Sequence, residues 1–380
     1  VWDSKSILEY PEENFYKNPE VNNLLAVWNI DTDSVSLIDS NGFCNSKILP
    51  NGKYALAQLR SSISSQTDEI RPADYYSINL ETYKSNLVVT QGSSSAGALK
   101  VSPNGKYLSY FKDGNYYVYY NDQAKSTNVT IGILTDFNDV EFDDSGSNPG
   151  YYSPGWSADS KFVILYDQYD IWLISADGKI SKRITNGFQN KTRFRLVVNR
   201  SAINIGNFAA IATETLDVQK GILIVARSYD KSTGYYVYNS KQSLRKLAHG
   251  NYKVSKILKA KSADRFIYSS ESDARPPSII SISGISYNPK PIYQSNPHYI
   301  NYEWSNTELI SYKNSKGDPL HGLLMFPAGY DPAKKYPMVV YIYERLSQLR
   351  YDYNAPGLRN PIGFLPANYF LDDYFVLMPD

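Results

Sequence analysis

The chain has 380 residues, of which 42% are hydrophobic and 20% are charged. This composition is ordinary for a globular protein with a sizeable core, and at about 150 residues per domain the length allows two or three domains. The net charge of +1 gives no sign of the basic surface typical of nucleic-acid or anionic-lipid binding. The single cysteine, Cys44, excludes an intrachain disulfide and a cysteine-based metal site, and no apolar run approaches the ~20 residues that cross a bilayer. We therefore expect no nucleic-acid partner and no membrane span, with Cys44 as a small buried hydrophobe.

The first part of the chain predicts a β-hairpin. Residues 24–30 and 35–38 favour strands, and Asp-Thr-Asp at 31–33 favours the turn between them. The chain starts at Val1 and no signal peptide follows, so we expect that it is cut at both ends.

A repeated motif organises the region that follows. Residues 50–54 and 103–107 both read Pro-Asn-Gly-Lys-Tyr, and 157–162 and 262–266 are weaker copies. The turn positions 51, 104, 159 and 264 are separated by 53, 55 and 105 residues, so a degenerate copy is expected near 217–226. A period near fifty residues with several strands in each period predicts a β-propeller or a similar radial array.

The residues of each copy suit a turn that leads into a strand. Proline fixes φ, asparagine and glycine tolerate φ above zero, and aromatic or β-branched residues follow. After the third copy, the sequence predicts a tight bend at 167–170, a strand, a turn at 177–179 and a further strand ending near 185.

An acidic stretch at residues 135–155 interrupts the strand pattern. Its spacing does not fit a calcium-binding loop, so no metal site is predicted. We interpret the stretch as a solvated loop between strands. The alternative is a loop at the mouth of the propeller in which Glu141 meets a substrate amine, which makes Glu141 the one substrate-binding candidate.

The character of the sequence changes near residue 303. Residues 304–327 predict a hairpin with its turn at 315–318, and the run Met338–Tyr343 has no alternation, which is typical of a strand buried on both faces. A second apolar run at 374–378 predicts a parallel neighbour. The fold class is therefore mainly β: a propeller over residues 1–303, which need not be complete at its N-terminus, followed at 304–380 by the first strands of an α/β domain.

The C-terminal motifs resemble the prolyl oligopeptidase family of serine peptidases. The resemblance lies in Gly-Asp-Pro-Leu-His-Gly-Leu-Leu-Met-Phe-Pro at 317–327, in residues 330–344 and in Met-Pro-Asp at 378–380. The dipeptidyl peptidase IV and acylaminoacyl peptidase branches are the nearest. The resemblance implies an α/β-hydrolase domain with a Ser-Asp-His triad, a propeller that filters peptide substrates by size, and no cofactor.

In the dipeptidyl peptidase branch, a tyrosine after the strand that corresponds to Met338–Tyr343 donates its hydroxyl to the oxyanion. The matching residue is Tyr343, so the resemblance implies an oxyanion-hole role for it. A preorganised donor of this kind is worth about 2.7–4 kcal/mol in acyl transfer. The next residues, Glu-Arg-Leu-Ser at 344–347, depart from the Gly-Pro turn of that branch and put the shape of the adjacent pocket in doubt.

The sequence lacks the remaining chemistry that the resemblance implies. No Gly-x-Ser-x-Gly elbow occurs, and the three histidines precede the position of a triad histidine. We interpret His249 and His298 as turn residues and His321 as a strand-end residue. The adjacent glutamates Glu12 and Glu13 are not favoured as holders of a substrate amine. The chain is therefore predicted to be inactive alone.

A second function remains open: a stand-alone propeller that binds a protein or a glycan, with residues 318–380 as an appended sheet. Uncovered apolar strands predict that the chain either associates or holds the residues after about 318 loosely, so homo-oligomerisation also stays open. The resemblance favours a periplasmic or secreted location. Peptide specificity is not readable from these residues.

Overall fold

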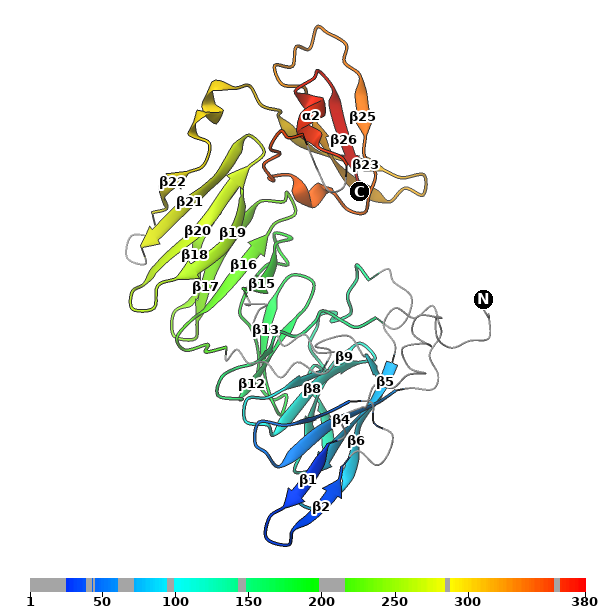
Figure 1. Ribbon diagram of the computed structural model, residues 1–380. Helices are drawn as coiled ribbons and strands as arrows, with labels where there is room; N and C mark the ends of the chain where they lie inside the picture. Colours follow the sequence, from blue (N-terminus) through cyan, green and yellow to red (C-terminus); the bar gives the residue numbers. More distant parts are fainter. Residues whose placement is uncertain are drawn as a thin grey trace. The chain divides into compact units, whose positions relative to one another are not determined.

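The computed structural model describes residues 25–38, 43, 45–60, 72–93, 99–142, 148–197, 216–283, 288–358 and 363–380. Cys44 and the Glu12-Glu13 pair lie outside these ranges. The described residues form strands and little helix, so the mainly β fold class is confirmed (Figure 1). None of the helices among them is both long and apolar enough to cross a membrane.

The predicted hairpin near the N-terminus is present. Strand β1 (Ala26–Asn29) pairs antiparallel with β2 (Ser34–Leu37). The side chain of Asn29 accepts hydrogen bonds from the backbone N–H groups of Asp31 and Thr32, at 3.1 and 3.2 Å. An asparagine that bonds to the backbone in this way favours a turn, which is why the chain reverses here.

In the described part of the chain, five four-stranded sheets follow, and in each the strands lie in chain order, as in a meander. Sheets of this kind, repeated along a chain, are the blades expected of a propeller. They are β3 (Asn45–Ile48), β4 (Tyr54–Arg60), β5 (Pro72–Asn79) and β6 (Ser85–Ser93); β7 (Leu99–Val101), β8 (Tyr107–Lys112), β9 (Asn115–Tyr120) and β10 (Lys125–Asn128); β11 (Gly155–Trp156), β12 (Phe162–Tyr166), β13 (Ile171–Ser175) and β14 (Ser181–Arg183); β15 (Arg193–Leu196), β16 (Ile222–Arg227), β17 (Thr233–Asn239) and β18 (Ser243–Gly250); and β19 (Lys253–Lys259), β20 (Arg265–Ser272), β21 (Arg275–Ser283) and β22 (Lys290–Gln294).

The repeated turns connect the first and second strands of these sheets. Asn51, Asn104 and Asp159 each accept a hydrogen bond from the backbone N–H two residues later, at 3.0–3.2 Å. Gly52 and Gly105 both have φ of 66°, the left-handed conformation that glycine adopts without strain. The degenerate copy is also confirmed, because a turn at Asp217–Gly221 leads into β16.

The sheets bury aromatic and branched side chains between them. The sheets β7–β10 and β11–β14 share one cluster, in which the rings of Tyr107 and Trp156 stack with centroids 5.5 Å apart. A single meander sheet cannot bury both of its faces, so this packing stabilises each sheet through its neighbour. The fully buried members of the cluster are Tyr116, Val118, Val129, Phe137, Trp156, Val163, Leu165 and Ile174.

The chain divides into two compact units. The first comprises residues 1–188, 195–222 and 238–243, and the second comprises 189–194, 223–237 and 244–380. The second unit therefore includes both β19–β22 and the C-terminal sheet. The domain boundary at residue 303 stays a prediction.

The C-terminal sheet has the order β23-β24-β26-β25, formed by β23 (Thr307–Lys313), β24 (Pro319–Met325), β25 (Met338–Val340) and β26 (Phe375–Pro379). Strands β23, β24 and β26 pair antiparallel, whereas β25 and β26 are parallel. The predicted hairpin and the predicted parallel pair are thus confirmed. Among the described residues, short helices complete this region: η2 (Pro297–Asn301), η3 (Ser347–Leu349) and α2 (Pro366–Phe370).

One expectation about this sheet was wrong. Residues 338–343 were expected to form a strand buried on both faces, but β25 has only three residues, and Met338 and Val340 are each about half exposed. The physical reason is the position of β25 at the edge of the sheet. Helix α2 packs with the central strands through Phe370 and Val376, and that cluster covers one face only.

Candidate functional site

Tyr343 lies in the loop that follows β25. The backbone N–H of Tyr341 still donates to the carbonyl of Leu377 at 2.9 Å, so pairing with β26 continues one residue past the strand. The chain then leaves the sheet, and Ile342 and Tyr343 are 77% and 61% exposed. The structure therefore places the Tyr343 side chain at the surface after the third strand of the sheet. Its role as an oxyanion donor stays a prediction.

The backbone at Glu344 is strained where the sequence departs from the family's Gly-Pro turn. Its φ is 46°, in the left-handed region that residues other than glycine, asparagine and aspartate rarely adopt. Such a conformation costs about 1–2 kcal/mol for a residue with a Cβ. The loop after β25 therefore has a sharp bend that this sequence makes without glycine.

The end of this loop is fixed to the end of β26 by one carboxylate. The backbone N–H of Ser347 donates to Oδ1 of Asp380 at 2.7 Å, and the Ser347 hydroxyl donates to Oδ2. Ser347 is only 2% exposed. Because hydrogen bonds to a carboxylate are stronger than those to a neutral acceptor, this contact is expected to hold η3 beside the sheet.

The residues after Ser347 bind the segment to other strands of the second unit. Arg227, at the end of β16, donates to the side-chain oxygen of Gln348 at 3.2 Å, and Arg350 donates to the backbone carbonyl of Asp230 at 2.9 Å. The partners are about 120 residues apart in the chain. Segment 347–352, which we call the anchor segment, thus connects the C-terminal sheet with β16 and its neighbours.

A third contact of the anchor segment is ionic. Nζ of Lys253 lies 2.6 Å from Asp352 and 3.2 Å from Glu271. Burial alone would lower the pKa of Lys253, but the hydrogen bond and charge of Asp352 and the charge of Glu271 outweigh it and raise the pKa. The ammonium group therefore stays charged and bridges two carboxylates that would otherwise repel each other.

The three histidines have structural surroundings. His298 lies in η2, as a turn-like residue. His321 lies within β24, where its Nδ1 is 3.1 Å from the Ser311 hydroxyl and its ring contacts Tyr229. His249 was expected in a turn but is the penultimate residue of β18. Strand β18 continues through Gly250, and the chain reverses only after that residue.

His249 is surrounded by hydroxyl groups, an arrangement that sequence reasoning missed. Its Nε2 is 3.0 Å from Ser228 and 3.1 Å from Ser232, and its Nδ1 is 2.9 Å from the Tyr236 hydroxyl. Only the strand pairing brings these residues together, so no spacing in the sequence signals the cluster.

The geometry around His249 does not match a Ser-His-Asp triad. In a triad the carboxylate orients the histidine ring, but here the Ser232 hydroxyl donates to Asp230 at 2.6 Å, and the Tyr236 hydroxyl takes the orienting position at Nδ1. Burial lowers the pKa of His249, although the charge of Asp230 opposes this shift. A neutral imidazole with Nε2–H donating to Ser232 satisfies this network, so we interpret it as structural.

Glu141 lies exposed in the part of the acidic stretch that the structure describes. The backbone N–H of Glu141 donates to Asp139 at 3.0 Å, and Asp139 is held in turn by Asn148. Hydrogen bonds of this kind, in which a short polar side chain accepts from a nearby backbone N–H, form turns. Residues 143–147 lie outside the description, and the described residues contain no cluster of three potential metal ligands. Substrate binding by Glu141 stays a prediction.

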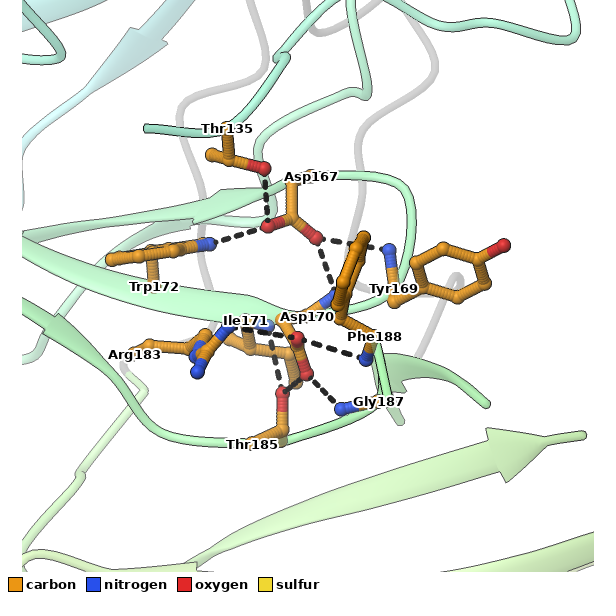
Figure 2. A network of polar contacts seen from close by, with 10 residues as sticks. All are labelled: Thr135, Asp167, Tyr169, Asp170, Ile171, Trp172, Arg183, Thr185, Gly187 and Phe188. Carbon is orange, nitrogen blue, oxygen red and sulfur yellow. Dashed lines mark hydrogen bonds and ion pairs between the residues drawn. The ribbon is translucent and has the colours of Figure 1, made fainter. Parts of the chain in front are cut away.

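The predicted bend at 167–170 forms a network of polar contacts in the first unit, which Figure 2 shows. Oδ1 of Asp167 accepts from the backbone N–H groups of Tyr169 and Asp170, at 2.9 and 2.6 Å. Oδ2 accepts from the Thr135 hydroxyl at 3.0 Å and from the indole N–H of Trp172 at 2.8 Å. This carboxylate therefore closes the bend between β12 and β13 and also holds the loop that follows β10.

The second carboxylate of the bend, Asp170, is fully buried. Its Oδ1 accepts from the Thr185 hydroxyl at 2.6 Å and from the N–H of Gly187 at 2.5 Å. Its Oδ2 accepts from the N–H of Phe188 at 3.3 Å and lies 3.9 Å from Arg183 (Figure 2). Every carboxylate oxygen of the bend is thus engaged by the protein, so the pair supports structure rather than ligand binding.

Three solved peptidase structures align with this chain. A putative dipeptidyl aminopeptidase IV from Bacteroides ovatus aligns at 14% identity and a TM-score of 0.50, over 93% of this chain and 58% of that one. Dipeptidyl peptidase 4 of Porphyromonas gingivalis aligns at 12% identity and a TM-score of 0.34, over 95% and 69% of the two chains. Acylaminoacyl peptidase of Pyrococcus horikoshii aligns at 13% identity and a TM-score of 0.37, over 95% and 61%.

The first of these alignments carries the comparison, and it concerns the fold. At 14% identity it shows the fold alone, which this chain shares with a putative dipeptidyl aminopeptidase IV, a protein of one of the branches that the motifs resemble. The chain spans about 58% of the length of that peptidase. No protein-family profile and no curated protein sequence matches the chain.

Proposed function

We propose that this chain is the propeller-bearing part of a serine exo- or oligopeptidase, and that residues 304–380 begin its α/β-hydrolase domain. The observation that carries the proposal is the parallel pair of β25 and β26, with Tyr343 in the loop directly after β25. In α/β-hydrolases the oxyanion hole takes a donor from the loop after the third strand. β25 is the third strand of this sheet along the chain, and this position supports the proposed role of Tyr343.

In the complete enzyme the Tyr343 hydroxyl would donate a hydrogen bond to the oxyanion of the tetrahedral intermediate. The exposure of the Tyr343 side chain suits this role, because a hydroxyl that already donates a hydrogen bond within the protein would have to break that hydrogen bond first. The serine, aspartate and histidine of the triad would come from sequence beyond residue 380, so the chain as given would bind no covalent inhibitor of serine peptidases. Short peptides would be the substrates, and a periplasmic or secreted location would suit them.

The test uses a fluorophosphonate probe, which labels activated serines. We expect no labelling of the 380-residue chain, and labelling of the longer product of the same gene, which should contain a Gly-x-Ser-x-Gly elbow. In that longer protein, Tyr343→Phe should lower kcat about 100- to 1,000-fold with little change in KM, because the lost donor acts only in the transition state. Tyr330→Phe, which changes another tyrosine of the same region, is the control. Labelling of the 380-residue chain, or an unchanged kcat in Tyr343→Phe, contradicts the proposal.

The second candidate function is a binding module for a protein or a glycan. The observation in its favour is the array of meander sheets, whose loops are exposed and carry large apolar side chains such as Ile131, Leu134 and Phe188. In that case the gene would end near codon 380, and no downstream elbow would be found. Sequencing of the parent gene therefore separates the two functions.

A further inference from the structure

Glu344, the residue directly after Tyr343, carries an exposed carboxylate. Among the residues that the structure describes, no hydrogen bond or ion pair engages this carboxylate, whereas the next residue, Arg345, has an interaction of its own. The other carboxylate near this loop, that of Asp380, accepts both hydrogen bonds from Ser347. The carboxylate of Glu344 therefore stays open to a cationic group from outside the chain.

The backbone conformation at this position does not favour a glutamate. Its φ of 46° is one that glycine adopts without strain and that asparagine and aspartate tolerate better than glutamate does. Other described residues, such as Tyr83 and Lys191, also have positive φ, so the conformation alone does not mark a site. Strained residues are nevertheless concentrated at binding and catalytic sites. A long acidic side chain at a bend that glycine would fit better indicates a role for that side chain outside the fold.

Glu344 lies at the edge of the C-terminal sheet where a ligand is expected. Strands β25 and β26 are parallel, so their carboxyl ends share one edge of the sheet. Glu344 follows the end of β25 within a few residues. In open α/β sheets, ligands bind outside the carboxyl ends of the strands. The free carboxylate is therefore on the side of the sheet from which a substrate would approach.

Glu344 and Tyr343 would contact the same short stretch of a bound peptide. Consecutive Cα atoms are about 3.8 Å apart, and an extended peptide spans about 3.3–3.6 Å per residue. If the Tyr343 hydroxyl donates to the scissile carbonyl, the α-amine of a peptide that begins two residues before the scissile bond lies within about 7 Å of that carbonyl. An ammonium or guanidinium group suits a carboxylate in this place, because it supplies both positive charge and N–H donors.

We propose that Glu344 determines specificity by binding a cationic group of the peptide substrate close to the scissile bond. This inference rests on the proposed function, because Tyr343 locates the scissile carbonyl. Two sources share the chemistry: the α-ammonium group of a short peptide, and the side chain of a lysine or arginine. The contact is made in the ground state and in the transition state alike, so it lowers KM and leaves kcat unchanged.

The test uses the longer product of the same gene and a pool of short peptides of varied sequence, with cleavage followed by mass spectrometry. Each peptide is present with a free and with an acetylated N-terminus, and with arginine or its neutral analogue citrulline. We expect cationic forms to be cleaved with a kcat/KM about fivefold higher than that of neutral forms, and added salt to reduce this preference. Glu344→Gln should abolish the preference through KM.

Two further variants complete the test. Asp373→Asn is the matched control, since Asp373 is also exposed and has φ of 62°, but it precedes β26 and so lies at the opposite edge of the sheet. It should keep the preference. Glu344→Gly removes the backbone strain together with the carboxylate, so it should lose the preference without a fall in Tm.

A preference for free over acetylated N-termini assigns the contact to the α-ammonium group, and a preference for arginine over citrulline assigns it to a side chain. Either result supports the inference. Equal cleavage of cationic and neutral forms, a preference that persists in Glu344→Gln, or its loss in Asp373→Asn overturns the inference alone, provided that Tyr343→Phe still lowers kcat. If the longer product cleaves no peptide, the inference and the proposed function are both wrong.

Discussion

Replacement of Asp170 by asparagine tests whether the buried carboxylate of the 167–170 bend holds the first unit together. The side chain is fully buried and accepts from Thr185, Gly187 and Phe188. Asparagine keeps one oxygen but turns the other into an NH₂ group, which would face the N–H of Phe188 and the guanidinium of Arg183. Hydrogen bonds to a charged group contribute about 1.5–3 kcal/mol, and a buried donor without an acceptor adds a penalty, so we expect a loss of about 3 kcal/mol.

The assay is thermal unfolding followed by circular dichroism, with hydrogen exchange of the β13 and β14 amides to localise the effect. At about 2–4 °C per kcal/mol, the expected fall in Tm is about 6–12 °C. Asp177→Asn is the matched control: Asp177 accepts from Ser175 and Lys179 in the next turn of the same sheet, but its side chain is 49% exposed. Solvent replaces its lost contacts, so its cost should stay below about 1 kcal/mol. Equal stability of the two variants would refute the argument.

Three further predictions concern the second unit. Lys253→Met should destabilise the second unit by about 1–2 kcal/mol in urea unfolding, because the substitution leaves Asp352 and Glu271 as a partly buried pair of like charges. An unchanged free energy of unfolding would mean that solvent already screens the two carboxylates. The pKa of His249 is lowered in the folded state, so the neutral ring contributes its full stabilisation of the fold above pH 6.5 and loses it as the pH falls further. Between pH 8 and pH 5, the His249→Gln variant should therefore lose less stability than the unmodified protein. Parallel pH profiles of the two proteins would contradict this. Glu344→Gly should raise the free energy of unfolding by about 0.5–1 kcal/mol. Glycine adopts φ of 46° without strain, and the relief of backbone strain exceeds the entropic cost of ordering a glycine. A lower Tm would show that the Glu344 side chain contributes contacts of its own.

The sequence was sufficient to predict the features that depend on neighbouring residues. The Asn-Gly turns at 51–52 and 104–105 were recognisable because φ above zero and the side-chain hydrogen bond of asparagine are properties of those two residues alone. The parallel pair β25–β26 was recognisable from two apolar runs separated by a long connection. The burial of β25 was not recognisable from the sequence. The burial of an edge strand depends on which elements cover it, and a hydrophobic run carries no information about those elements.

Contacts between distant residues left no signal in the sequence. Lys253 and Asp352 are 99 residues apart, and Lys253 has many other acidic residues within the same chain distance. Two of the hydroxyl groups around His249, those of Ser228 and Ser232, lie in the turn before β17, and the third, that of Tyr236, lies in β17, so they meet the ring of His249 only once β17 and β18 have paired.

The anchor segment bears directly on Tyr343. On one side of its loop, the backbone N–H of Tyr341 is bonded to β26, and on the other side Ser347 is bonded to Asp380, which directly follows the same strand. Only residues 342–346 lie between these two fixed points. An oxyanion donor must be held within a fraction of an ångström of its working position, which a free loop cannot provide. A short loop closed at both ends on β26 can provide it, so the proposed role of Tyr343 depends on Asp380 as much as on the tyrosine itself.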